Sequence, residues 1–182
     1  MSHRLPQLVL VVIALCVMAV SQAAHAATGV ITGTLEKVDS GAKTVAVKSS
    51  DGTVKTVKFT SNTSVRGLKD AGKASELAGK EGGHVIVYTS GKTAHSVTWL
   101  GDKTVHATKG TVEEVGKGSK TVAVKTADGT KETFEVADHA TVDTGKGVAR
   151  YSARGAKKGE HVTVYYTEEA GKKIAHGFKR VL

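Results

Sequence analysis

The residues best suited to chemistry in this chain are histidines that recur at matching places. His84 and His95 in the first half correspond to His161 and His176 in the second. Imidazole pairs on one face of a sheet can bind Zn²⁺, Cu²⁺ or Ni²⁺. Two ligands do not complete a site, and no carboxylate is clearly placed to add a third. The alternative is that these are polar strand residues copied by duplication.

The expected geometry of the pair depends on one turn. If Ser90-Gly91 is a two-residue turn, Ile86 lies opposite His95 and Val97 lies opposite His84. The two histidines would then be diagonal neighbours on one face, roughly 7–8 Å apart.

Positive charge is the second candidate feature. The net charge is +9, which favours a polyanion such as nucleic acid, lipopolysaccharide or acidic polysaccharide. Tyr88, Trp99, Tyr165, Lys48 and Lys125 are candidate ligand-surface residues. Because lysines alternate with acids and lie at turns, an ordinary solvated surface is the alternative interpretation.

Signals for catalysis are missing from the sequence. There is no Gly-x-Ser-x-Gly elbow, no phosphate-binding glycine loop and no His-Glu-x-x-His pair. The sequence therefore predicts a protein that is not an enzyme and that needs no cofactor.

Residues 1–26 have the features of a signal peptide. Arg4 precedes an apolar run from Leu8 to Val20, and Ala24-His25-Ala26 is a cleavage motif. We expect cleavage after Ala26, or else after Ala23; an uncleaved membrane anchor is the alternative. The mature protein would be periplasmic or secreted, without a transmembrane segment. Export argues against nucleic acid as its natural partner.

All sulfur-containing residues fall in that first segment. Cys16 is the single cysteine, and Met1 and Met18 are the two methionines. The mature chain would therefore have no disulfide, no thiolate nucleophile and no sulfur ligand for a soft metal.

The rest of the chain contains an internal duplication. Residues 33–53 (GTLEKVDSGAKTVAVKSSDGT) align without a gap to residues 110–130 (GTVEEVGKGSKTVAVKTADGT), at an offset of 77. The match continues more loosely, with a four-residue insertion before Ala175. It predicts domains over residues 27–100 and 107–182, joined by a linker at residues 101–106.

Each copy reads as five short strands. In the first copy they cover residues 29–38, 44–48, a third strand ending with Val57 and Phe59 facing inward, 84–89 and 93–100. Gly33 lies within the first strand, where a glycine indicates a bulge or sharp bend. Asp51-Gly52 marks a hairpin. A short helix is expected within residues 68–78, and within 147–156 in the second copy.

The order of these elements predicts an all-β fold of two tandem OB-like barrels. Three strands, a short helix and two further strands in about 75 residues is the OB-type order. Closure also removes the two edges that an open sheet would expose. A small sandwich or an SH3-like barrel is the structural alternative.

The motif in each copy resembles that of small exported bacterial domains of unknown function that are expected to be OB-like. In the first copy it comprises Gly33, Val38-Asp39, residues 44–53 and residues 82–88. The second copy has Gly116 in place of the aspartate. A fainter resemblance is to periplasmic copper-chaperone OB barrels, which use Met, His and Trp; the lack of methionine in the mature chain argues against a Cu(I) role.

The sequence thus predicts a non-catalytic binding or structural protein of the bacterial envelope, whose partner is an unknown small ligand or an envelope polymer. One alternative is a periplasmic accessory protein that binds divalent metal through the repeated histidines. The other is an envelope binder of polyanions.

Overall fold

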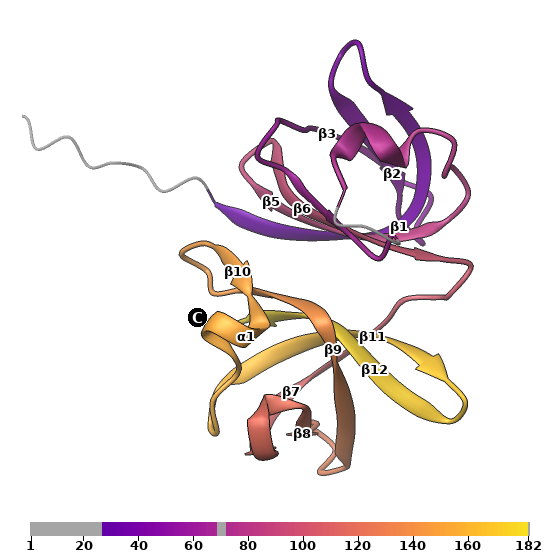
Figure 1. Ribbon diagram of the computed structural model, residues 1–182. Helices are drawn as coiled ribbons and strands as arrows, with labels where there is room; N and C mark the ends of the chain where they lie inside the picture. Colours follow the sequence, from indigo (N-terminus) through magenta and orange to yellow (C-terminus); the bar gives the residue numbers. More distant parts are fainter. Residues whose placement is uncertain (1–26, 69–71, 182) are drawn as a thin grey trace, which may run out of the picture.

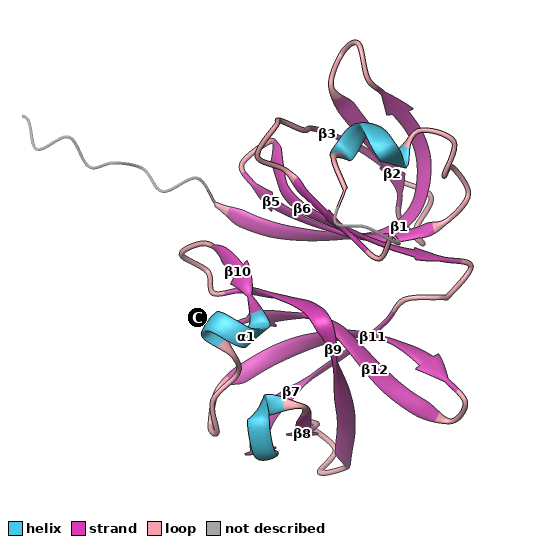
Figure 2. Ribbon diagram, in the orientation of Figure 1, coloured by secondary structure: helices cyan, strands magenta, loops and turns pink. Residues whose placement is uncertain are grey.

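A computed structural model describes residues 27–68 and 72–181 of the chain (Figure 1). The predicted signal peptide lies outside these residues. Strands dominate, and the helices are single turns (Figure 2). The prediction of an all-β fold with OB-like barrels is confirmed. Within the described ranges, no helix is long and apolar enough to cross a bilayer.

The first six strands form one sheet, here called the first barrel. Its strand order is β3-β2-β1-β5-β6-β4. The elements are β1 (Thr28–Asp39), β2 (Thr44–Lys48), β3 (Val54–Lys58), β4 (Ser64–Arg66), the 3-10 helix η1 (Ala74–Leu77), β5 (His84–Ser90) and β6 (Thr93–Gly101).

The last six strands form a second sheet, here called the second barrel, in the order β10-β9-β12-β11-β7-β8. The elements are β7 (His106–Val115), the 3-10 helix η2 (Lys117–Ser119), β8 (Thr121–Lys125), β9 (Lys131–Asp143), β10 (Val148–Arg150), the helix α1 (Tyr151–Arg154), β11 (His161–Glu169) and β12 (Lys172–Arg180). The short helices η1 and α1 lie within the two ranges in which helices are expected.

Parallel strand pairs close each barrel. In the first barrel, β4 and the end of β3 both pair with β6, so β4 is a strand beyond the five that were expected. In the second, β9 runs unbroken and pairs with β12 along much of its length. Closure leaves few unpaired backbone groups at the sheet edges, which protects the sheets from pairing with other chains.

A glycine lets the first strand of each barrel pair with two neighbouring strands in succession. Up to Thr34, β1 pairs with β5; from Thr34 onward it pairs with β2. A Cβ on Gly33 would lie 2.1 Å from the carbonyl oxygen of Lys48. At the corresponding Gly110, it would lie 2.3 Å from that of Lys125. The backbones approach this closely because glycine has no side chain. The bulge of this strand lies further along, between Leu35 and Lys37 in the first barrel and between Val112 and Glu114 in the second.

The alternating valines face inward as predicted. Val45, Val47, Val57 and Phe59 are all buried in the core of the first barrel. The core of the second barrel adds aromatic contacts, with Tyr151 stacked on Phe178 at a centroid distance of 4.6 Å. The predicted Asp51-Gly52 hairpin is also present: Gly52 has a φ of +82° and its N–H donates to the carbonyl of Ser49.

The predicted register of the β5–β6 hairpin is wrong. Ser90 pairs with Thr93, so the turn consists of Gly91 and Lys92, one residue later than expected. The ladder then shifts because His95 is the extra residue of a β-bulge. His84 pairs with Gly101, at the other end of the ladder.

The outer face of β5 is apolar as well, and the second barrel covers it. Ile86 and Tyr88 point away from the first core, yet both are completely buried. Together with Leu100 they form a third apolar cluster, which includes Val148 and Tyr165 of the second barrel. Each fully buried side chain of this size contributes about 1.5–3 kcal/mol. The two barrels are therefore held against each other by a hydrophobic contact.

Specific contacts fix the position of the barrels at this interface. The Tyr88 hydroxyl donates to the carbonyl of Thr141 at 3.3 Å. The hydroxyl also packs directly against Gly177: a Cβ on that residue would lie only 1.7 Å from the Tyr88 oxygen. Nearby, Thr28 Oγ1 donates to the buried Asp143 carboxylate at 2.7 Å. Close approach and directional bonds together define one arrangement of the two barrels.

We predict that Gly33→Ala destabilises the protein by about 1–3 kcal/mol, because the new methyl group forces the β1 and β2 backbones apart. Urea unfolding measures the change in free energy. Gly147→Ala is the control, since a Cβ there meets nothing within 4 Å. Equal stability of the two variants would contradict the role assigned to the close backbone approach at Gly33.

Candidate functional site

A pocket of about 420 Å³ lies between the two barrels. One wall comes from the end of β6 and the segment after it, residues 98–103, with Gly67 beside it. The other wall comes from the second barrel and consists of Ala137, Asp138, His139 and His176. Both barrels are needed to form this pocket.

The pocket wall from the second barrel forms where the pairing between β9 and β12, which closes this barrel, is interrupted. On β12, His176 is the extra residue of a bulge between Ala175 and Gly177. On the facing strand β9, pairing stops at Val136 and resumes at Thr141. Residues 137–140 therefore bow away from the ladder beside His176, and this excursion brings Asp138 and His139 to the pocket.

A hydrogen-bonded chain fixes the orientation of the His176 ring. Lys103 Nζ donates to Glu169 Oε1 at 2.9 Å, and Thr167 Oγ1 donates to the same oxygen at 3.1 Å. Thr167 Oγ1 also lies 2.9 Å from His176 Nε2. Since the hydroxyl has given its one hydrogen to the carboxylate, Nε2–H must be the donor to Thr167. The network therefore assigns the lone pair of the neutral ring to Nδ1.

Burial keeps this imidazole neutral. Loss of hydration lowers the pKa of His176 to about 4; the Glu169 carboxylate opposes this fall and the Lys103 ammonium adds to it. The hydrogen bond from Lys103 in turn holds the pKa of Glu169 below its ordinary value. At neutral pH the pocket thus presents an uncharged ring, which is the form that binds metals or accepts a hydrogen bond.

The structure does not bring the predicted histidine pairs together. His84 and His95 lie at opposite ends of the β5–β6 ladder. His161 begins β11, where its Nδ1 lies 2.9 Å from the Thr111 hydroxyl, while His176 belongs to the pocket. In the first barrel the expected diagonal arrangement fails because the turn falls one residue later than expected and the bulge then shifts the register further.

The three predicted aromatic residues have different environments. Tyr88 is completely buried between the barrels, so it offers no open surface. Tyr165 is half-buried in the same apolar cluster. Trp99 is half-buried and lines the pocket, with Nε1 donating to the carbonyl of Lys80 at 3.4 Å. Of these, Trp99 is the one that a ligand in the pocket would meet.

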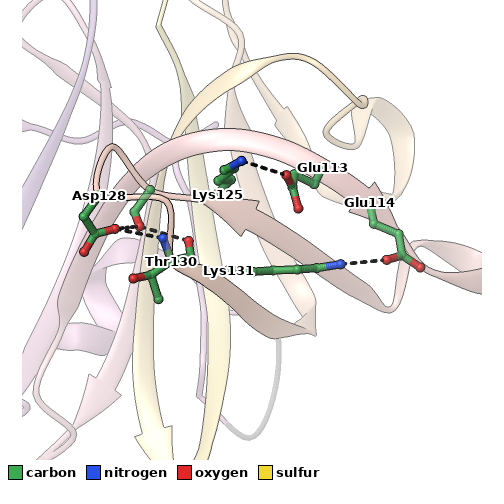
Figure 3. Close-up of polar contacts among 7 residues, drawn as sticks. Glu113, Glu114, Lys125, Asp128, Thr130 and Lys131 are labelled. Atoms are coloured by element: carbon green, nitrogen blue, oxygen red, sulfur yellow. Dashed lines mark hydrogen bonds and ion pairs between the residues drawn. The ribbon is translucent and has the colours of Figure 1, made fainter.

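The two predicted lysines also differ in their surroundings. Both are exposed, at equivalent ends of β2 and β8. Lys125 lies 3.9 Å from Glu113, and the neighbouring Lys131 lies 3.2 Å from Glu114 (Figure 3). Lys48 forms no ion pair within the described residues. The lysines of the second barrel are therefore partly neutralised, whereas Lys48 is not.

Sequence reasoning missed His139 and Asp138. Their counterparts in the first barrel are Asn62 and Ser61, so this position is one where the two copies differ in chemistry. That difference is the signal that could have identified them. Among residues 27–68 and 72–181, no three His, Cys, Asp or Glu side chains form a group arranged to hold a metal ion.

Comparisons with known proteins show a partial likeness to CusF. A crystal structure of Ag(I)-bound CusF matches 43% of this chain and 99% of its own, at 13% identity and a TM-score of 0.33. Apo-CusF from Escherichia coli matches 44% of this chain and 90% of its own, at 13% identity and a TM-score of 0.34. No protein-family model and no curated protein matches the chain. A likeness of this size says nothing about what this chain binds.

We predict that His176 makes the protein less stable in acid. Its pKa is about 4 in the folded state and about 6.5 when unfolded, so the unfolded chain binds more protons between these values. Stability is fully present above pH 6.5 and falls by about 3 kcal/mol as the pH drops to 4. Urea midpoints measured across this window test the prediction.

The matched control is the equivalent bulge residue of the first barrel, His95, which is exposed. His176→Gln should flatten the pH dependence, and His95→Gln should leave it as in the unaltered protein. Parallel curves for all three proteins would show that His176 does not titrate in this window.

Proposed function

We propose that this chain is a non-catalytic binding protein of the bacterial cell envelope, and that a small ligand occupies the pocket between its two barrels. The observation that supports this most directly is the origin of the walls, since residues 98–103 and residues 137–139 come from different barrels. Ligand binding would therefore require the tandem arrangement.

The chemistry of the lining suits a small polar ligand. Trp99 offers an aromatic surface, Lys103 a cation and His176 a hydrogen-bond acceptor. A few polar groups that converge on an apolar wall are typical of ligand sites. Placement at the junction of two domains is also typical.

The same network favours binding over catalysis. The hydroxyl that hydrogen-bonds to the His176 ring is that of Thr167, which is completely buried and does not line the pocket. That hydroxyl donates to Glu169 and accepts from His176, so the imidazole does not serve it as a base. A nucleophile activated by a neighbouring base would require the opposite arrangement.

A thermal-shift panel of amino acids, sugars, dicarboxylates and phosphate esters tests the proposal. A ligand present at one hundred times its Kd adds about 2.7 kcal/mol of stability and raises the Tm. Trp99 is the single tryptophan of the chain, so its fluorescence reports on the pocket. We expect at least one compound to shift both signals.

Ala137→Phe, which fills the pocket, should abolish both responses. Thr60→Phe is the matched control, because Thr60 is the exposed counterpart of Ala137 in the first barrel. The proposal fails if no compound produces a response, or if the Ala137→Phe variant responds as strongly as the control.

A second candidate ligand is a divalent transition-metal ion. It is favoured by the presence of both His139 and His176 in the pocket lining, together with the lone pair that the Thr167 hydrogen bond assigns to His176 Nδ1. The hydrogen bonds that run from His176 through Thr167 to Glu169 are of the kind that orients metal-binding imidazoles. Water or ligand atoms would have to complete the coordination.

Equilibrium dialysis against Cu²⁺, Ni²⁺ and Zn²⁺ separates this candidate from the first. We expect His139→Gln and His176→Gln each to weaken binding about ten-fold or more, because each substitution removes a metal ligand. His95→Gln, the matched control, should not weaken it. Loss of binding in a His84→Gln, His161→Gln double variant instead would place the metal elsewhere.

A further inference from the structure

Five exposed lysines gather on one side of the first barrel. We call this surface the lysine face; it consists of Lys37, Lys43, Lys48, Lys58 and Lys92. They come from β1, the β1–β2 turn, β2, β3 and the β5–β6 turn. Residues far apart in the sequence thus contribute to one surface.

Backbone pairing brings these segments together. The N–H of Lys58 donates to the carbonyl of Lys92 at 3.0 Å, and the N–H of Phe59 donates to that of Lys43 at 2.8 Å. Three lysines therefore meet at one end of the barrel. Lys37 and Lys48 continue the surface across β1 and β2, on the side opposite the inward-facing Val45 and Val47.

Most of these charges have no partner. Lys37 lies 3.9 Å from Asp39, and because Lys37 is largely exposed and Asp39 partly exposed, this pair contributes little. Within the described part of the chain, the other four lysines form no ion pair. An anionic ligand could therefore pair with these four lysines without displacing a carboxylate of the protein.

The corresponding surface of the second barrel is built differently. At the 77-residue offset, Lys37 is replaced by Glu114 and Lys58 by Glu135. These glutamates and the neighbouring Glu113 form ion pairs across the strands: Glu114–Lys131 at 3.2 Å, Glu135–Lys172 at 2.7 Å and Glu113–Lys125 at 3.9 Å. Figure 3 shows two of these pairs.

The two barrels differ in how their charged side chains are paired, and their net charges are equal. Residues 27–100 contain 10 basic and 6 acidic residues, and residues 107–182 contain 14 and 10, so both segments carry a net charge of +4. The second barrel neutralises this surface internally. The first leaves it cationic, in the strand 2–3 and loop region that OB barrels use for polymeric ligands.

The lysine face contains no aromatic residue, and this narrows the class of ligand that it can bind. The first barrel has three aromatic residues: Phe59 and Tyr88 are buried, and Trp99 lies at the pocket. Binding of single-stranded nucleic acid normally combines cations with aromatic stacking on the bases. The lysine face offers charge without stacking.

We propose that the lysine face binds an anionic polysaccharide, one whose carboxylate or sulfate groups pair with these lysines. This site is separate from the pocket, so it does not depend on the proposed small ligand. The protein would hold an envelope polymer with one surface while its pocket remains open.

Heparin binding by the mature chain, measured by titration at several salt concentrations, tests the proposal. The Lys43→Glu, Lys48→Glu variant should bind at least about ten-fold more weakly, and its salt slope should fall by about one for each lysine that no longer pairs with an anionic group. The matched control is Lys120→Glu, Lys125→Glu, which makes the same change at the equivalent positions of the second barrel. Circular dichroism confirms that both variants are folded.

Three results would overturn the proposal. The first is no heparin binding at low salt by the unaltered protein. The second is equal weakening of both variants, which would indicate attraction to net charge alone. The third is tighter binding of single-stranded DNA than of heparin, which would make nucleic acid the ligand. Binding that weakens in the first variant alone supports the lysine face, whether or not the pocket has a ligand.

Discussion

The two-sided burial of β5 determines how the rest of the molecule is arranged. Val85 and Val87 fill the core of the first barrel, while Ile86 and Tyr88 on the reverse side require a second cover. A single small barrel would expose that reverse side to water. The second barrel supplies the cover, and the approach of Tyr88 to Gly177 determines how closely it fits. The pocket exists because this contact brings the end of β6 against the place where the pairing of β9 with β12 is interrupted.

The sequence is informative wherever the pattern is local. The alternation of Val45 and Val47 and the Asp51-Gly52 hairpin depend on neighbouring residues, and both are predicted correctly. The run Val85–Tyr88 also contains a signal for burial on both faces, because a continuous apolar run is typical of a fully buried strand. Interpreting it as an ordinary alternating strand misses the contact between the barrels.

The site residues are harder to predict for two physical reasons. A bulge adds one residue to a strand, and no local pattern identifies His95 or His176 as that residue. The shift moves the histidines out of the expected pairs. The pocket also combines residues 98–103 with His139 and His176, and their proximity depends on packing between barrels. Such proximity is not visible in either half alone.

The bulge at His176 has an evolutionary consequence. The strand pairs normally on both sides of this residue, so the ladder does not depend on which side chain occupies it. The same holds for His95 in the other copy. A scaffold of two similar barrels, each with an unpaired residue at this position, can exchange that side chain without breaking the pairing of its strands. Relatives could therefore acquire new ligand preferences by drift at this single position, and a protein engineer could use it in the same way.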